Sequence, residues 1–249
     1  MKKYDLHIHS EYSDGLNSIE DIIVSAIEKG FDIVGISDHS YTEFDESYCI
    51  KKEDVQNYYN EIERLKNKYS DKIKVYSGIE QDFYSDESDV QFDYKIGSVH
   101  YLKVNGCYLP VDESKEILLS DVDKHFGSDI YAYLECYFET VSKVIDKTNA
   151  DIIGHIDLIN KFNENDCLFD TNNIRYITAF KNACDKLLKA GRYFEINTGA
   201  ISRGYRSSPY PSNEIYNYLN DNGAKFILSS DSHSIDTIGY LFDKYKNCI

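Results

Sequence analysis

Short apolar segments alternate with longer amphipathic segments along nearly the whole chain, and this alternation constrains the fold most strongly. Seven segments have the apolar, β-branched character of strands: residues 4–8, 31–37, 73–80, 92–100, 150–156, 192–198 and 224–230. Between them, the spacing of apolar residues predicts helices over residues 18–29, 51–69, 129–147, 172–190 and 211–219. This order favours an α/β fold with a parallel sheet. Seven repeats suit a closed or nearly closed barrel better than an open doubly wound sheet.

The chain shows no linker, low-complexity run or internal repeat, so we expect one domain over residues 1–249. The chain has 27 Lys and Arg residues and 43 Asp and Glu residues, which gives a net charge of −16. No basic cluster could hold a nucleic-acid backbone, so nucleic acid is not an expected partner. The negative charge would also repel a phosphorylated small molecule unless metal ions reverse the sign locally.

Cysteine usage and hydropathy bear on the location of the protein. The six cysteines are scattered without a C-x-x-C pair, which predicts reduced thiols. The first strand begins too early to leave room for a targeting peptide, and no apolar run approaches the roughly 18 residues of a membrane helix. We therefore expect a cytoplasmic protein with no membrane partner.

Histidines gather where the predicted strands end. In "YDLHIHSEYSDG", His7 and His9 alternate with apolar residues, so both side chains leave the strand on the same face. Six of the seven histidines lie at or just past a strand end: His7, His9, His39, His100, His155 and His233. In a parallel barrel these ends share one face, where enzymes of this architecture keep their chemistry.

Carboxylates accompany these histidines. Asp14, Asp38, Glu80 and Asp231 lie in the same strand-end segments. Imidazoles and carboxylates together are the ligand set of zinc, manganese and iron. A single histidine is more often structural, but six coincidences of strand end and histidine, with acids close by, argue for a metal site. This number of donors exceeds what one ion can use, which indicates a cluster of ions.

The motifs "DLHIHSEYSDG", "ISDH", "GIE", "IGSVH", "GHID" and "SDSH" follow one another from residue 5 to residue 233. In this order they resemble the PHP family, the polymerase-and-histidinol-phosphatase group of metal-dependent phosphoesterases. The resemblance implies a distorted seven-stranded (β/α)7 TIM-like barrel, in agreement with the strand count. It also implies three divalent metal ions, zinc, manganese or iron, on the C-terminal face of the barrel.

The resemblance also implies a ligand scheme. One ion would take His7, His9, Glu80 and Asp231; a second would share Glu80 and take His100 and His155; a third would take Asp14, His39 and His233. Asp38 has no ligand role in this scheme and is expected to support a neighbouring ligand or cap a loop. All nine positions carry ligating residue types, which favours an active enzyme over a metal-binding module without turnover.

The segments "FDYKIGSVHYL" and "FEINTGAISRGYRSSPYPS" resemble those family members that act in histidine biosynthesis. The implied reaction is hydrolysis of L-histidinol phosphate to L-histidinol and inorganic phosphate. The alternative is a PHP phosphoesterase for another phosphorylated metabolite or a nucleotide. Glu11, Glu43, Asp157 or Tyr101 could line a recess for the amine and imidazole of histidinol.

The expected mechanism uses water, because no side chain is an obvious covalent nucleophile. Two ions bridged by Glu80 would hold a hydroxide between them that attacks the phosphorus. Two of the five arginines, Arg203 and Arg206, follow the sixth predicted strand and are candidates to bind phosphate, and Lys161 is a further candidate. Asp231 or His233 is expected to transfer the proton to the leaving oxygen.

Overall fold

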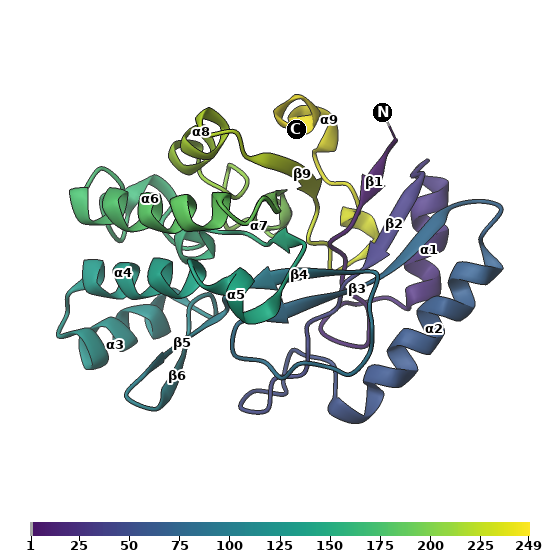
Figure 1. Ribbon diagram of the computed structural model, residues 1–249, viewed down its shortest axis with the longest axis horizontal. Helices are drawn as coiled ribbons and strands as arrows, with labels where there is room; N and C mark the ends of the chain where they lie inside the picture. The colour runs from purple at the N-terminus through teal and green to yellow at the C-terminus, as the bar shows by residue number, and fades with distance from the viewer. Residues whose placement is uncertain (1) are drawn as a thin grey trace.

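The computed structural model describes residues 2–249 and places seven parallel strands at the centre of the molecule (Figure 1). Hydrogen bonds join them in the order β1-β2-β3-β4-β7-β8-β9. Their bounds are β1 Tyr4–Asp5, β2 Ile33–Ile36, β3 Lys74–Asp82, β4 Tyr94–Ser98, β7 Ile152–Ile153, β8 Tyr193–Asn197 and β9 Lys225–Ser229. The α/β fold with seven strands in a nearly closed barrel is confirmed.

The seam of the barrel lies between β1 and β9, where a few contacts replace a full ladder. Just past the strand ends, the N–H of His9 donates to the carbonyl of Ser232 over 2.8 Å. Below this bridge, the Asp5 carboxylate accepts a hydrogen bond of 2.5 Å from the Ser230 hydroxyl. The seam therefore closes by one backbone bridge and by side-chain contacts, and this departure from regular pairing makes the barrel distorted.

Helices surround the sheet (Figure 1). They are α1 Ile19–Glu28, α2 Val55–Lys68, α3 Lys115–Phe126, α4 Ile130–Val141, α5 Val144–Thr148, α6 Ile174–Leu188, α7 Gly199–Ser202, α8 Asn213–Asp221 and α9 Phe242–Tyr245. α1 and α2 cover the side of β2 and β3, while α3, α4 and α6 lie on the opposite side of the molecule. The Ser18 side chain caps α1 by accepting from the N–H of Asp21, as the spacing of its sequence indicates.

Two segments differ from the sequence prediction. The helix expected over residues 129–147 is two helices, α4 and α5, separated at Ser142 and Lys143. The strands β5 Tyr101–Val104 and β6 Cys107–Pro110, which the spacing did not indicate, form an antiparallel hairpin through Asn105 and Gly106. Both turn residues have positive φ, 50° and 84°, which is the backbone that an Asn-Gly pair adopts readily.

A buried tyrosine ties the core to the ends of two strands. Tyr58 on α2 is fully buried, accepts from the N–H of Asp38 and donates to the carbonyl of Gly78 over 2.9 Å. The segments after β2 and within β3 are thereby held together, which positions the side chains of His39 and Glu80.

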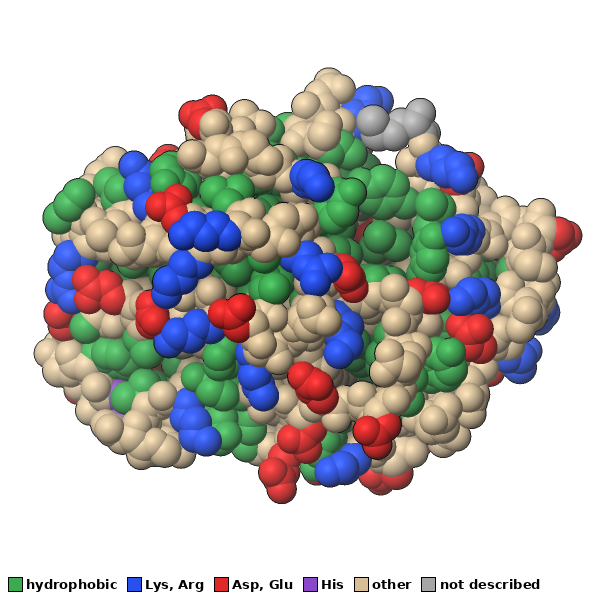
Figure 2. Space-filling model, viewed as in Figure 1, with side chains coloured by type: hydrophobic (Ala, Val, Ile, Leu, Met, Phe, Trp, Pro, Cys, Tyr) green, Lys and Arg blue, Asp and Glu red, His purple; other side chains and the backbone are tan. Residues whose placement is uncertain are grey.

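Surface charge is mixed on the face seen in Figure 2, where Lys and Arg side chains lie between Asp and Glu. All six cysteines are free thiols, as predicted. Between residues 2 and 249, no helix combines the length and the apolar character that crossing a bilayer requires.

Candidate metal centre and active-site cavity

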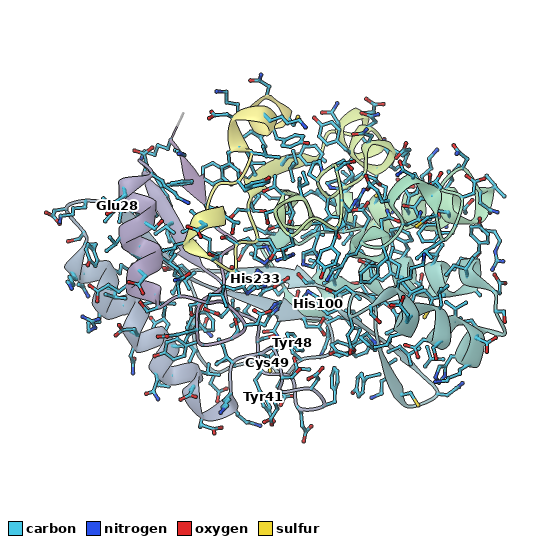
Figure 3. All side chains as sticks on the ribbon, turned by 180° about the vertical axis from the view of Figure 1, so that it is seen from behind. Glu28, Tyr41, Tyr48, Cys49, His100 and His233 are labelled. Atoms are coloured by element: carbon cyan, nitrogen blue, oxygen red, sulfur yellow. The ribbon has the colours of Figure 1, made fainter. Side chains whose placement is uncertain are left out.

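The C-terminal ends of the strands bring nine donor side chains together. They are His7, His9, Asp14, His39, Glu80, His100, His155, Asp231 and His233, and they fall into four overlapping groups that could each hold an ion. Figure 3 labels His100 and His233 near the middle of the fold, with Tyr48 below them. The structure thus places all nine predicted ligands in one cluster, although their role as ligands stays a prediction.

Glu80 lies at the centre of this cluster, and its two oxygens face different histidines. Oε1 lies 2.9 Å from His155 Nε2 and 3.6 Å from His100 Nε2. Oε2 lies 3.2 Å from His7 Nε2 and 3.6 Å from His9 Nε2. This arrangement fits a carboxylate that bridges two ions, one on each oxygen.

The remaining donors form a group on the outer side of the cluster. His233 Nε2 lies 3.2 Å from Asp14 Oδ2, and His39 Nε2 lies 3.7 Å from Asp14 Oδ1. The other nitrogen of His39, Nδ1, lies 3.0 Å from Glu80 Oε2. His39 therefore stands between the outer group and the Glu80 group, and either nitrogen could face an ion.

The donor chemistry fits divalent cations. Two ligands each about 2.1 Å from one ion are separated by roughly 3.0–3.5 Å, which matches the closer spacings around Glu80. Four buried atoms that face other donors of the cluster have no hydrogen-bond partner among the described residues: His7 Nε2, both nitrogens of His9, and Glu80 Oε2. Unpartnered buried polar atoms are costly, so their convergence is expected where an ion completes the site.

The electrostatics of the cluster couple histidines to carboxylates. Burial lowers the pKa of His39, but the charges of Glu80 and Asp14 outweigh burial and raise this pKa to about 9. Burial and the neighbouring His233 and His39 lower the pKa of His9 to about 3. Divalent cations would replace the protons that such carboxylates otherwise share with imidazoles.

Glu195 supports this cluster and was missed by the sequence analysis. It lies on β8, is buried, and its Oε1 accepts from His7 Nδ1 over 2.5 Å. Burial alone would raise the pKa of Glu195, but the neighbouring His7 lowers it below its usual value. An acidic residue within the apolar strand "RYFEINT" was the signal that could have indicated it.

Two further carboxylates hold cluster segments in place. Asp82 accepts from the backbone N–H of His100 over 2.7 Å, which holds the backbone at this residue, and the carboxylate lies 3.3 Å from His100 Nδ1. Asp38 accepts from both the N–H and the hydroxyl of Ser10 at 2.7 Å and thereby shapes the loop after β1. Asp38 was predicted to have such a supporting role.

A cavity of about 400 Å³ opens above the cluster. Its base consists of Asp14, His39, His100, His155, Asp231 and His233. Arg203 and Lys161 also line it, together with three acidic residues, Asp45, Asp112 and Glu113, and three tyrosines, Tyr48, Tyr101 and Tyr205. The cavity therefore has a metal-ligating base, two cationic side chains, and a wall of carboxylates and phenols.

The predicted substrate residues separate into those inside this cavity and those outside it. Lys161 lines the cavity and pairs with Asp112 over 2.9 Å. Arg206 does not line it, and its role in phosphate binding stays a prediction. The chain turns at Gly204, with φ of 76°, and Arg206 stacks on Tyr210 at 4.8 Å beside Asp157.

The predicted recess for an organic cation also needs correction. Of the four candidates, only Tyr101 lines the cavity. Glu11 lines a different surface hollow, Glu43 is exposed, and Asp157 is buried behind the wall, where it accepts from Ser212. The carboxylates that border the cavity come instead from the loop after β2 and from the chain after the hairpin, which are Asp45, Asp112 and Glu113.

Comparisons with known proteins agree with this architecture. A protein of Schizosaccharomyces pombe named "Probable histidinol-phosphatase" is 28% identical over 255 residues, which covers 92% of this chain and 79% of that protein. A solved structure from Listeria monocytogenes, provisionally assigned as a histidinol phosphatase, superposes with a TM-score of 0.83 at 22% identity and covers 98% of this chain and 100% of that one. A histidinol phosphate phosphatase of Lactococcus lactis, solved with zinc, L-histidinol and phosphate, gives a TM-score of 0.73 at 19% identity and covers 100% and 92%.

The family itself follows from the sequence. The family model of the PHP domain matches residues 5–199, which include seven of the nine cluster residues; Asp231 and His233 follow the matched range. Since the match spans more than half of the sequence, the chain belongs to the PHP family.

Proposed function

We propose that this protein is a metal-dependent phosphatase that hydrolyses L-histidinol phosphate to L-histidinol and inorganic phosphate, with residues 1–249 acting as one PHP domain. The main support for this proposal is the composition of a single cavity. Its base consists of six of the nine donor side chains, and its wall combines Arg203 with the carboxylates of Asp45, Asp112 and Glu113. A substrate with an anionic end and a cationic organic end fits this distribution of charge. The names of the relatives support the same substrate.

The base of the cavity is suited to the phosphate end. Three divalent ions held by the nine donors would act as Lewis acids and lower the pKa of a water molecule, so that water can attack the phosphorus near neutral pH. The side chains of the protein hold and orient the ester. Arg203 borders the same cavity and can donate to phosphate oxygens from its planar guanidinium.

The leaving oxygen needs a proton, and His233 is better suited to supply it than Asp231. Burial would raise the pKa of Asp231, but Arg203 and His7 hold it well below its usual value, so this carboxylate stays ionised. His233 lines the cavity and is partly exposed, so its ring can reach the leaving oxygen of a bound ester. We therefore assign proton donation to His233 and leave Asp231 as a ligand.

The outer wall is suited to the histidinol moiety. Asp45 Oδ2 accepts from the Tyr101 hydroxyl over 2.5 Å, which fixes a carboxylate and an aromatic ring next to each other. Tyr48 lies with its ring centroid 6.2 Å from that of Tyr101, in a stacked orientation. A carboxylate beside aromatic rings can bind an ammonium group and pack against an imidazole.

The test is phosphate release by protein reconstituted with zinc, manganese or iron, measured with L-histidinol phosphate beside glycerol phosphate, phosphoethanolamine and a nucleoside monophosphate. We expect a kcat/KM of about 10⁴ M⁻¹s⁻¹ or more for histidinol phosphate, well above the other esters. Equal rates across the panel would refute histidinol phosphate as the specific substrate and would indicate a general phosphatase. A clear preference for the nucleotide would support a different phosphoesterase of the same family.

A further inference from the structure

Glu195 lies behind the metal centre on β8, with 1% of its surface exposed. One of its oxygens, Oε1, accepts from His7 Nδ1 over 2.5 Å and from the Ser229 hydroxyl over 2.6 Å. The other, Oε2, accepts from the backbone N–H of His155 over 2.9 Å and from Asn197 Nδ2 over 3.0 Å. A buried carboxylate with four donors around it is held in one orientation.

This carboxylate determines which nitrogen of His7 faces the centre. Because Nδ1 points at Glu195, Nε2 points the other way, 3.2 Å from Glu80 Oε2 and 3.9 Å from Asp231 Oδ1. Nε2 is buried and has no hydrogen-bond partner among residues 2–249. A histidine ligand whose other ring nitrogen donates to a carboxylate is fixed in both tautomer and ring orientation.

Asn197 extends this support to a second donor of the cluster. Its Nδ2 spans two carboxylates, 3.0 Å from Glu195 Oε2 and 3.2 Å from Asp231 Oδ2. Its Oδ1 accepts from the N–H of Gly199 over 2.8 Å, so the amide orientation is determined by both of its ends. Oδ2 of Asp231 is engaged by Asn197 and also by Arg203 Nη2 at 3.1 Å, so the other oxygen is left facing His9 Nε2 at 3.3 Å.

We propose that Glu195 and Asn197 are positioning residues for the metal centre. They help to set which nitrogen of His7 and which oxygen of Asp231 point toward the ion site that these two residues would form with His9. They thereby determine the affinity of that site for a divalent ion. The inference rests on the proposed function in that it concerns the same centre. Ion retention, however, does not depend on which phosphate ester is hydrolysed.

The variant Glu195→Gln tests this directly, because it turns one acceptor oxygen into an NH₂ group that faces hydrogen-bond donors on either side. We expect zinc affinity at one site to fall roughly 10- to 100-fold. After dialysis against a zinc buffer set near the wild-type dissociation constant, the variant should therefore retain less zinc per chain by elemental analysis. Asp121→Asn is the matched control, since Asp121 is a buried carboxylate on α3 outside the cluster. It should retain as much zinc as the wild type.

A second readout separates positioning from simple support of the fold. In zinc-loaded wild-type protein, two-bond ¹H–¹⁵N correlation spectra should show His7 with its proton on Nδ1 and with a zinc-shifted Nε2. A proton on Nε2, or unchanged zinc affinity in Glu195→Gln, would overturn the proposal.

If circular dichroism shows that Glu195→Gln is unfolded, Asn197→Ser decides the question. This variant keeps the contact between Glu195 and His7. It removes the amide that joins Glu195 to Asp231, together with the acceptor for the Gly199 N–H. We expect a several-fold loss of zinc affinity, and no loss would overturn the proposal. A wild-type protein that binds zinc but hydrolyses no ester would refute the proposed function alone, while one that binds no divalent ion would overturn both.

Discussion

Arg203 and Asp231 form an ion pair of 3.1 Å between Nη2 and Oδ2 at the wall of the cavity. The other terminal nitrogen, Nη1, donates to the backbone carbonyl of Asp231 over 3.1 Å and lies 2.8 Å from His233 Nδ1. One guanidinium thus holds both cluster residues that follow β9 and still borders the cavity. Of the two arginines in this segment, it is therefore the one placed to contact a phosphate at the metal centre.

Replacing Arg203 with lysine should lower kcat/KM for the phosphate ester by about 10²-fold or more, because an ammonium group cannot reproduce the planar set of donors. Inhibition by inorganic phosphate should weaken in parallel. Steady-state kinetics on the reconstituted enzyme measures both effects. The control is Arg192→Lys, since Arg192 pairs with Asp151 outside the cavity. A change of less than about threefold in Arg203→Lys would contradict a direct role at the phosphate.

Replacing Glu80 with glutamine should remove the bridge between the two sides of the cluster. The amide nitrogen cannot ligate a cation, so we expect reduced metal content and a loss of activity of at least about 10³-fold. Metal analysis and phosphate release measure the two effects. Glu63→Gln is the control, because Glu63 is on α2 and pairs with Lys66 away from the cavity. Full metal content in Glu80→Gln would show that the bridging assignment is wrong.

Much of the metal centre could be predicted because strand geometry is local. A strand alternates its faces every residue, so His7 and His9 had to share a face, and parallel strand ends had to meet at one end of the barrel. The supporting residues were harder to predict. Glu195 is recognisable only once β8 is known to pass behind His7, and its contact spans 188 residues of sequence.

The residues that line the substrate side of the cavity could not be predicted either, and the reason is different. Loop side chains point where the turn and the neighbouring packing direct them, and no periodicity governs them. Arg203 and Arg206 are three residues apart, yet one borders the cavity and the other packs on Tyr210. Asp45 was missed because its position depends on its contact with Tyr101, which is 56 residues away.

Replacing Asp45 with asparagine should affect recognition of the organic part of the substrate. The loss of one charged contact corresponds to about 1–2 kcal/mol, so KM for L-histidinol phosphate should rise roughly 5- to 30-fold. Glycerol phosphate, which has no cationic group, should be hydrolysed as by the wild type. Glu43→Gln is the control from the same loop, since Glu43 does not line the cavity. An equal effect on both esters would argue against a cation-binding role.

Replacing Arg206 with methionine should affect stability more than recognition. The side chain of Arg206 is 7% exposed and that of Asp157 is fully buried, with 3.8 Å between Nη1 and Oδ2. Removing one partner leaves a buried charge without its counter-charge, which should cost about 2–4 kcal/mol of unfolding free energy. Urea unfolding measures this. Arg64→Met, which removes an exposed pair with Glu61, should cost less than about 1 kcal/mol. Equal costs would contradict a buried pair.

The last prediction concerns Asp5 at the seam of the barrel. Burial raises the pKa of this carboxyl to about 6 from its ordinary value of 3.8, and hydrogen bonds from Ser230, Gly239 and His7 only partly offset the effect. Between these two pKa values the folded chain binds more protons than the unfolded chain. The stability contribution of the protonated carboxyl is therefore complete below pH 3.8 and is lost as the pH rises through about 6.

Asp5→Asn removes this titration and should flatten the corresponding part of the pH profile. We expect the unfolding free energy of the wild type, relative to Asp5→Asn, to fall by up to about 3 kcal/mol between pH 4 and pH 7.5. Urea unfolding with a chelator present in every sample measures this difference without a contribution from bound metal. A constant difference across the range would mean that Asp5 is already ionised in the folded protein at pH 4. In that case its hydrogen bonds at the seam, and not its burial, would control its charge.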